Sequence, residues 1–174
     1  GQLLTGLTRR LQALSTSSPE LEALHGIAEM ALNDVRQLSR LMSPTILDDL
    51  GLKPALNWLC RNLLSGEDIE YHTEITVPPD LPKDISTLLF RIAQETLVNA
   101  IKHSEATNLT LSISYHHHVI RLDILDNGVG FDSKAIEPGI GLSSIRDRAE
   151  AFNATLEIDS AVGQGTRTTV TVPV

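Results

Sequence analysis

Four clusters in the second half of the chain have residue types and spacings that could do chemistry. The first is Glu95, Asn99 and His103, at positions i, i+4 and i+8 of a helical pattern, with Lys102 beside them. This spacing places a carboxylate, an amide and an imidazole along one helical face. Such a face could hold Mg²⁺ through oxygen, with Lys102 and His103 toward the phosphates that the ion bridges. A solvated helix face without a ligand is the alternative interpretation.

The second cluster is residues 126–130 (DNGVG), at the end of a predicted strand. Asp126 could accept a hydrogen bond from an exocyclic amine such as that of adenine. Gly128 and Gly130 would let the backbone approach the ring. Asn-Gly is also typical of a tight turn, but the polar, irregular residues 131–138 that follow do not favour a hairpin.

Two further glycine clusters follow along the chain. Residues 139–142 (GIGL) run directly into a predicted helix. Gly139 and Gly141 would thus leave backbone N–H groups free for phosphate at the positive end of a helix. Residues 163–166 (GQGT) precede the last predicted strand, where a hairpin loop is the alternative. Neither cluster is a Walker loop or a G-x-G-x-x-G fingerprint after a strand.

Hydrophobic periodicity predicts the elements that must position these clusters. Helices are predicted over 52–64, 83–103 and 144–152, and strands over 69–77, 109–115, 119–125, 155–159 and 166–172. The apolar side of the long helix consists of Ile85, Leu88, Leu89, Ile92, Ala93, Thr96, Leu97, Ala100 and Ile101. Strands beside helices without a regular βαβ repeat predict the α+β class, with an antiparallel or mixed sheet and helices on one face.

Residues 1–50 predict a separate module, a helical hairpin, before a second module at 51–174. Apolar residues alternate at steps of three and four from Leu21 to Met42, which is the pattern of a coiled-coil seam. Each helix has one apolar stripe, so the favoured solution is a homodimer that closes a four-helix bundle. Packing of the hairpin on the second module of the same chain is the alternative.

Composition excludes several classes of function. The 174 residues hold 14 basic and 22 acidic side chains, for a net charge of −8, and all of this excess lies in residues 63–174. A nucleic-acid binder needs a basic face, so no nucleic-acid partner is expected. No apolar run has the length of a membrane helix. The single cysteine, Cys60, cannot form an internal disulfide and fits a reducing compartment.

In this order, the four clusters resemble the ATP-binding domain shared by sensor histidine kinases, type II topoisomerases, Hsp90-type chaperones and MutL proteins. Residues 91–103 resemble the N box, 126–131 the G1 box, 139–148 the G2 region and 163–166 the last glycine box. The resemblance implies a GHKL or Bergerat-type α/β sandwich. Three features are similar to histidine kinases of the nitrate-sensor type, which partner NarL-type response regulators. They are the opening RIAQE and the pair Lys102-His103 of the N box, the helix GLSSIRDR at 141–148, and the segment SPTILDDLGL at 43–52.

That resemblance implies a role for each candidate residue. Asn99 would bind Mg²⁺ with Glu95 nearby, and Lys102 and His103 would face the phosphates of ATP. Asp126 would take the adenine amino group, and residues 131–140 would form a lid. The remaining cofactor-binding candidates are Gly128, Gly130, Gly139, Gly141, Leu142, Gly165 and Thr166.

The same resemblance implies a cytoplasmic two-component kinase core that passes the γ-phosphoryl of Mg-ATP to a histidine and then to a response-regulator aspartate. The acceptor histidine of the family motif H-D-x-x-G-Q-x-L would fall five residues before Gln2, outside this chain. Gln2 would orient water for dephosphorylation of the regulator. The full-length protein could be anchored in the inner membrane. The alternatives are an anti-sigma-type serine kinase of the same fold and a dimeric ATP-binding module without kinase activity.

The other histidines are expected to have no part in phosphotransfer. His25 is expected on the surface beside the helical seam. His116, His117 and His118 are expected in an exposed turn between two strands, since successive strand residues point in opposite directions and form no facial metal site.

Overall fold

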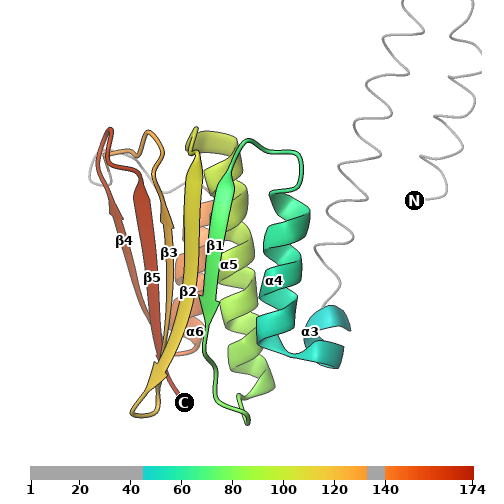
Figure 1. Ribbon diagram of the computed structural model, residues 1–174. Helices are drawn as coiled ribbons and strands as arrows, with labels where there is room; N and C mark the ends of the chain where they lie inside the picture. Colours follow the sequence, from blue (N-terminus) through green and yellow to red (C-terminus); the bar gives the residue numbers. More distant parts are fainter. Residues whose placement is uncertain (1–44, 133–139) are drawn as a thin grey trace, which may run out of the picture. The chain divides into compact units, whose positions relative to one another are not determined.

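A computed structural model describes residues 45–132 and 140–174 of the chain (Figure 1). The chain divides into two units, Gly1–Pro44 and Thr45–Val174. The predicted hairpin, Gln2, His25, Gly139 and most of the predicted lid therefore lie outside the described residues, and these assignments stay predictions. Of Gly141, only the backbone is described.

The described unit has four helices and five strands. The helices are α3 (Thr45–Leu50), α4 (Leu52–Leu63), α5 (Lys83–His103) and α6 (Ile140–Ala151). The strands are β1 (Glu70–Ile75), β2 (Asn108–His116), β3 (Val119–Asp126), β4 (Thr155–Ser160) and β5 (Thr166–Pro173). They form one mixed sheet in the order β1-β2-β3-β5-β4. Only β1 and β2 pair in parallel, which confirms the predicted α+β class with a mixed sheet.

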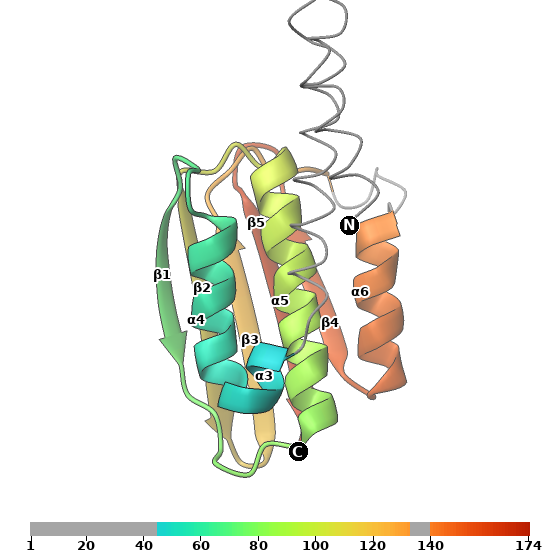
Figure 2. The ribbon, with the colours of Figure 1, turned by 90° about the vertical axis from the view of Figure 1, so that its right-hand side faces the viewer.

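The helices α4, α5 and α6 cover one face of this sheet, with α5 in the middle (Figure 2). The alternation of β3 explains this arrangement. Ile120, Leu122 and Ile124 point under the helices and are at most 1% exposed, while Arg121 and Leu125 point the other way and are exposed. Among the described elements no helix covers the second face, which is polar.

The helix α3 was not predicted from the sequence. It packs on α4 and α5 through the buried Leu47. Asp48 of α3 also forms an ion pair with Lys83, the first residue of α5, with 2.9 Å between Oδ1 and Nζ. Gly51 ends it with φ of +81°, donating its N–H to the Leu47 carbonyl oxygen at 3.0 Å. Glycine commonly ends helices in this conformation because it has no Cβ. The available signal in the sequence was a pair of leucines three residues apart, Leu47 and Leu50, followed by Gly51.

The remaining elements match the predicted ones closely, with one shift. Helix α6 begins at Ile140, four residues before the predicted start, so Gly141 lies in its first turn rather than before it. Of the three histidines expected in a turn, His116 is the last residue of β2 and only His117 and His118 form the turn to β3; all three are exposed. His117 and His118 have φ of +49° and +61°, as a two-residue hairpin turn requires. Cys60 is buried, and burial raises the pKa of its thiol to about 11.

Candidate functional site

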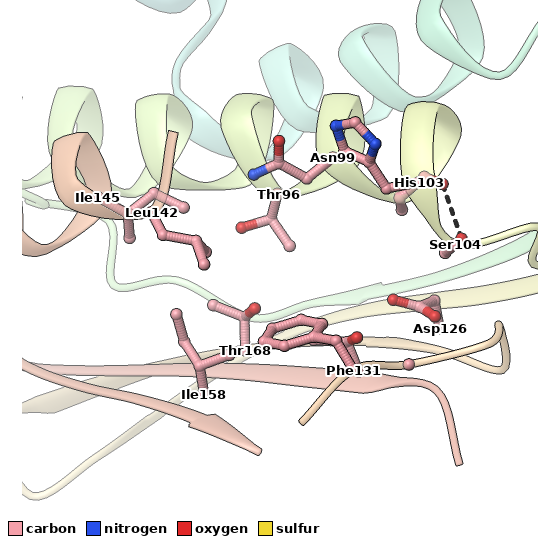
Figure 3. Close-up of a pocket in the computed structure, with 13 residues that line it drawn as sticks. Thr96, Asn99, His103, Ser104, Asp126, Phe131, Leu142, Ile145, Ile158 and Thr168 are labelled. Carbon is pink, nitrogen blue, oxygen red and sulfur yellow. Dashed lines mark hydrogen bonds between the residues drawn. The ribbon is translucent and has the colours of Figure 1, made fainter. Parts of the chain in front are cut away.

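One cavity of about 500 Å³ lies between α5, α6 and the ends of β3, β4 and β5 (Figure 3). This volume is in the range of small-molecule sites. Six of the predicted site residues line it: Asn99, His103, Asp126, Gly130, Leu142 and Thr166. They come from four segments that are far apart in the sequence, so the fold brings the four predicted clusters to one place.

The long helix presents a slightly different face to this cavity than the sequence predicted. Thr96, Asn99, Ala100 and His103 line it, at spacings of three, one and three residues. Glu95 and Lys102 do not line it, because each lies about 100° around the helix from a lining neighbour. Glu95 is half-buried and Lys102 is exposed. Their predicted roles toward metal and phosphate remain untested.

Asp126 occupies the sheet end of the cavity. The carboxyl is buried, and its Oδ1 accepts the N–H of Gly128 at 2.9 Å. Burial raises the pKa of this carboxyl, while hydrogen bonds from the backbone N–H groups of Gly128 and Thr166 act in the opposite direction. The side chain is therefore held in one orientation, and a hydrogen-bond donor on a ligand would reach it in a partly dry environment.

Three glycines around Asp126 pack closely against the protein's own backbone. A Cβ on Gly128 would lie 2.1 Å from the carbonyl oxygen of Ser104 at the end of α5. A Cβ on Gly130 would lie 2.1 Å from that of Ala161, and one on Gly165 would lie 2.0 Å from that of Asp126. The space that these glycines leave is filled by the protein's own backbone. They fix the corner of the cavity, and the room for a ring expected at Gly128 and Gly130 stays a prediction.

Two polar side chains hold that corner together, and the sequence assigned a role to neither. Asn127 Oδ1 accepts the N–H groups of Thr107 and Asn108 at 3.0 and 2.9 Å. Ser160 Oγ accepts the N–H of Phe131 at 2.9 Å and donates to the Gly165 carbonyl oxygen at 2.9 Å. Phe131 lines the cavity, so Ser160 positions one of its walls.

The rest of the lining was missed because it looks like ordinary core in the sequence. Thr96 had been placed on the apolar side of its helix, and Thr168, Ile145 and Ile158 belong to alternating or periodic patterns. In the described residues this lining contains no lysine or arginine, and His103 is its one basic side chain. No cluster of three or more His, Cys, Asp or Glu that could hold a metal occurs in residues 45–132 and 140–174.

Comparison with known proteins identifies the family of this fold. Residues 84–174 match the family described as histidine kinase-, DNA gyrase B-, and HSP90-like ATPase. The chain belongs to this ATPase family. The matched residues contain α5 from its second residue, α6 and β2 to β5, and so every segment that lines the cavity.

Two curated relatives of this chain are named as sensor histidine kinases. The chain is 33% identical over 156 residues to the oxygen sensor histidine kinase NreB of Staphylococcus carnosus, covering 87% of this chain and 44% of that protein. It is 32% identical over 151 residues to the sensor histidine kinase LiaS of Bacillus subtilis, covering 85% and 41%. The chain thus spans less than half the length of these curated relatives.

Solved structures agree on the fold. The histidine kinase domain of the blue-light activated kinase EL346 of Erythrobacter litoralis superposes with a TM-score of 0.65 at 18% identity, over 99% of this chain and 94% of that one. The histidine kinase AdeS of Acinetobacter baumannii superposes with a TM-score of 0.62 at 18% identity, over 99% of this chain and 93% of that one. Within residues 45–132 and 140–174, no helix is both long and apolar enough to cross a membrane.

Proposed function

We propose that this chain is the ATP-binding core of a two-component sensor histidine kinase. The observation that carries the proposal is the buried carboxyl of Asp126, which shares one cavity with Asn99 and His103. A carboxylate accepts hydrogen bonds only, so it selects a donor such as the amino group of adenine. The family match and the two named sensor kinases support this assignment.

Mg²⁺ fits the residues that line the cavity. The amide oxygen of Asn99 is an oxygen ligand, and Mg²⁺ in nucleotide sites uses few protein ligands because phosphates and water supply the others. The described lining has no lysine or arginine to neutralise a triphosphate. A bound Mg²⁺ would supply that charge and polarise the γ-phosphate. Asn99 would hold it, Glu95 would lie one turn away, and His103 at the rim would face the phosphates.

The phosphoryl acceptor would be a histidine on a helical bundle of a homodimer, and a NarL-type response regulator would receive the group next. These partners are inferred from the resemblance and the relatives, and the predicted seam of residues 21–42 would supply the dimer contact. Catalysis in such a core consists mainly of positioning and charge stabilisation. A cytoplasmic location, with a membrane anchor elsewhere in the natural protein, accords with this assignment.

Calorimetric titration with ATP tests the nucleotide site. The unaltered chain should bind ATP more tightly with Mg²⁺ than with EDTA, and Asn99→Ala should remove that difference while leaving ADP binding in EDTA nearly unchanged. Asn62→Ala on the exposed side of α4 is the matched control and should behave as the unaltered chain. Equal dependence on Mg²⁺ in Asn99→Ala would contradict the assignment of this residue.

Phosphorylation chemistry separates the kinase classes. A chain extended before Gly1 with the family motif H-D-x-x should incorporate phosphate from γ-labelled ATP in an acid-labile, base-stable form. An acid-stable product would indicate a serine kinase, and tight binding without any incorporation would indicate a module without kinase activity.

A further inference from the structure

The hydroxyl of Thr96 is an unsatisfied polar atom at the cavity. Of the buried side-chain oxygen and nitrogen atoms that the structure describes, Thr96 Oγ1 is the one without a hydrogen-bond partner. The residue is only 8% exposed, and it lines the cavity from the middle of α5. A buried hydroxyl that makes no hydrogen bond destabilises the folded state, so its presence calls for an explanation.

The helix itself does not satisfy this hydroxyl. Threonine in a helix often donates to the carbonyl oxygen four residues earlier. Thr87 on the same helix does so, at 2.8 Å from the Lys83 carbonyl oxygen. Ser104 does the same at its end, at 2.7 Å from that of Ala100. Figure 3 shows the Thr96 side chain on the side of α5 that faces the sheet, and its hydroxyl oxygen is buried there.

The surroundings of Thr96 suit a planar base better than a phosphate. Leu142, Ile145 and Ile158 form the neighbouring walls, together with Thr168 from β5 (Figure 3). Apolar walls of this kind accommodate an aromatic ring. The one basic side chain of the described lining, His103, lies seven residues after Thr96 on α5. Asn99, one helical turn further, is the residue assigned to the metal and phosphate end.

From these observations we infer that Thr96 is a base-contacting residue, whose hydroxyl donates to a ring nitrogen of the purine, directly or through one water. The inference rests on the proposed function and adds a residue to that site. Asp126 accepts from the amino group, and Thr96 supplies a donor for a neighbouring acceptor. An amino donor beside a ring-nitrogen acceptor is the pattern of the adenine edge. Threonine reaches two side-chain rotamers in a helix, so the hydroxyl can adjust to the ring without backbone movement.

Thr96→Val tests the inference because it keeps the shape of the side chain and removes only the hydroxyl. Affinity for ATP and for ADP should each fall about 3- to 10-fold, the effect of one hydrogen bond. The melting temperature of the free protein should stay equal or rise, since an unsatisfied group is replaced by a methyl. Thr96→Ser should retain affinity to within about twofold. Thr87→Val, on the same helix away from the cavity, should leave affinity unchanged.

Three results would overturn the inference while leaving the proposed function in place. The first is an unchanged affinity of Thr96→Val for both nucleotides. The second is a loss of affinity for ATP but not for ADP, which would place the contact at the phosphates. The third is a lower melting temperature of the free variant, which would indicate a structural role. Failure of the unaltered chain to bind either nucleotide would overturn the proposed function and this inference together.

Discussion

Asp123 and Asp126 lie three residues apart on β3, on opposite faces of the sheet, and their carboxyls have opposite pKa shifts. The hydrogen bond from Arg121, together with one from Thr169, lowers the pKa of Asp123. Burial raises the pKa of Asp126, whose partners are backbone N–H groups alone. On the face of the sheet that no described helix covers, here called the open face, the Asp123 carboxylate is paired with a cation. On the face toward the cavity, here called the cavity face, the Asp126 carboxylate has no cationic partner and is available to a ligand. A local cost of this kind is typical of functional sites.

The largest effect is expected where the cavity corner is packed against its own backbone. Gly165→Ala should lower the free energy of unfolding by about 3 kcal/mol or more, because its φ is +73° and the new Cβ would lie 2.0 Å from the Asp126 carbonyl oxygen. Gly163→Ala is the matched control, with φ of +78° but open space around the Cβ, and should cost only about 1 kcal/mol. Urea unfolding measures both, and equal losses would refute the tight packing of the corner.

The next effect concerns ligand binding at the cavity face. Asp126→Asn should weaken adenine-nucleotide binding about 10- to 100-fold, the effect of losing a charge-assisted hydrogen bond. The amide oxygen can still accept the Gly128 N–H, but the amide nitrogen cannot accept the Thr166 N–H, so the free energy of unfolding at pH 7 should change by no more than about 1 kcal/mol. Titration calorimetry and urea unfolding check the two halves of this prediction. Full affinity in Asp126→Asn would remove the main support for the adenine assignment.

The opposite pKa shifts predict opposite pH dependences of stability. For Asp126, whose folded pKa is raised, the stabilising contribution is present below the unfolded value near 3.8 and is lost as pH rises through the folded pKa. For Asp123, whose folded pKa is lowered, it is present above the unfolded value and is lost as pH falls through the folded pKa.

Urea unfolding of each asparagine variant beside the unaltered chain, between about pH 3 and pH 7, measures these contributions. From acid to neutral pH, the stability of the unaltered chain should fall relative to Asp126→Asn and rise relative to Asp123→Asn. Slopes of the same sign would show that the two carboxyls are not distinguished in the way the structure indicates.

The sequence was sufficient for most elements because their patterns are local. Helix α5 has the predicted bounds, Lys83–His103, since its apolar side repeats over the whole length and Pro82 precedes it. The pairing of β2 with β3 follows from the alternation on both sides of the histidine turn. Helix α3 was missed, because six residues with one buried leucine carry too weak a period to distinguish from a linker.

From the sequence, only those site residues could be predicted whose side chains are of types that commonly bind ligands. Asn99, His103 and Asp126 were found because amides, imidazoles and carboxylates in an otherwise apolar region call for partners. The reason for Gly165 was not accessible, since it depends on a backbone atom 39 positions earlier in the chain. Thr96 was assigned to the apolar side of its helix because its packed neighbours could not be known from the sequence either. Periodicity places a residue on a face, but whether its hydroxyl finds a partner there depends on the packed neighbours.

The smallest effect is expected on the open face. Arg121 Nε and Nη2 lie 2.6 and 3.0 Å from the two carboxylate oxygens of Asp123, and Thr169 Oγ1 donates to Oδ1 at 2.8 Å. The Arg121 side chain is 49% exposed, so solvent screens the pair. Asp123→Asn should therefore cost at most about 1 kcal/mol at pH 7 and leave nucleotide affinity unchanged. A double-mutant cycle with Arg121→Gln isolates the pair, and any change in affinity beyond about twofold would mean that the two faces of β3 are coupled.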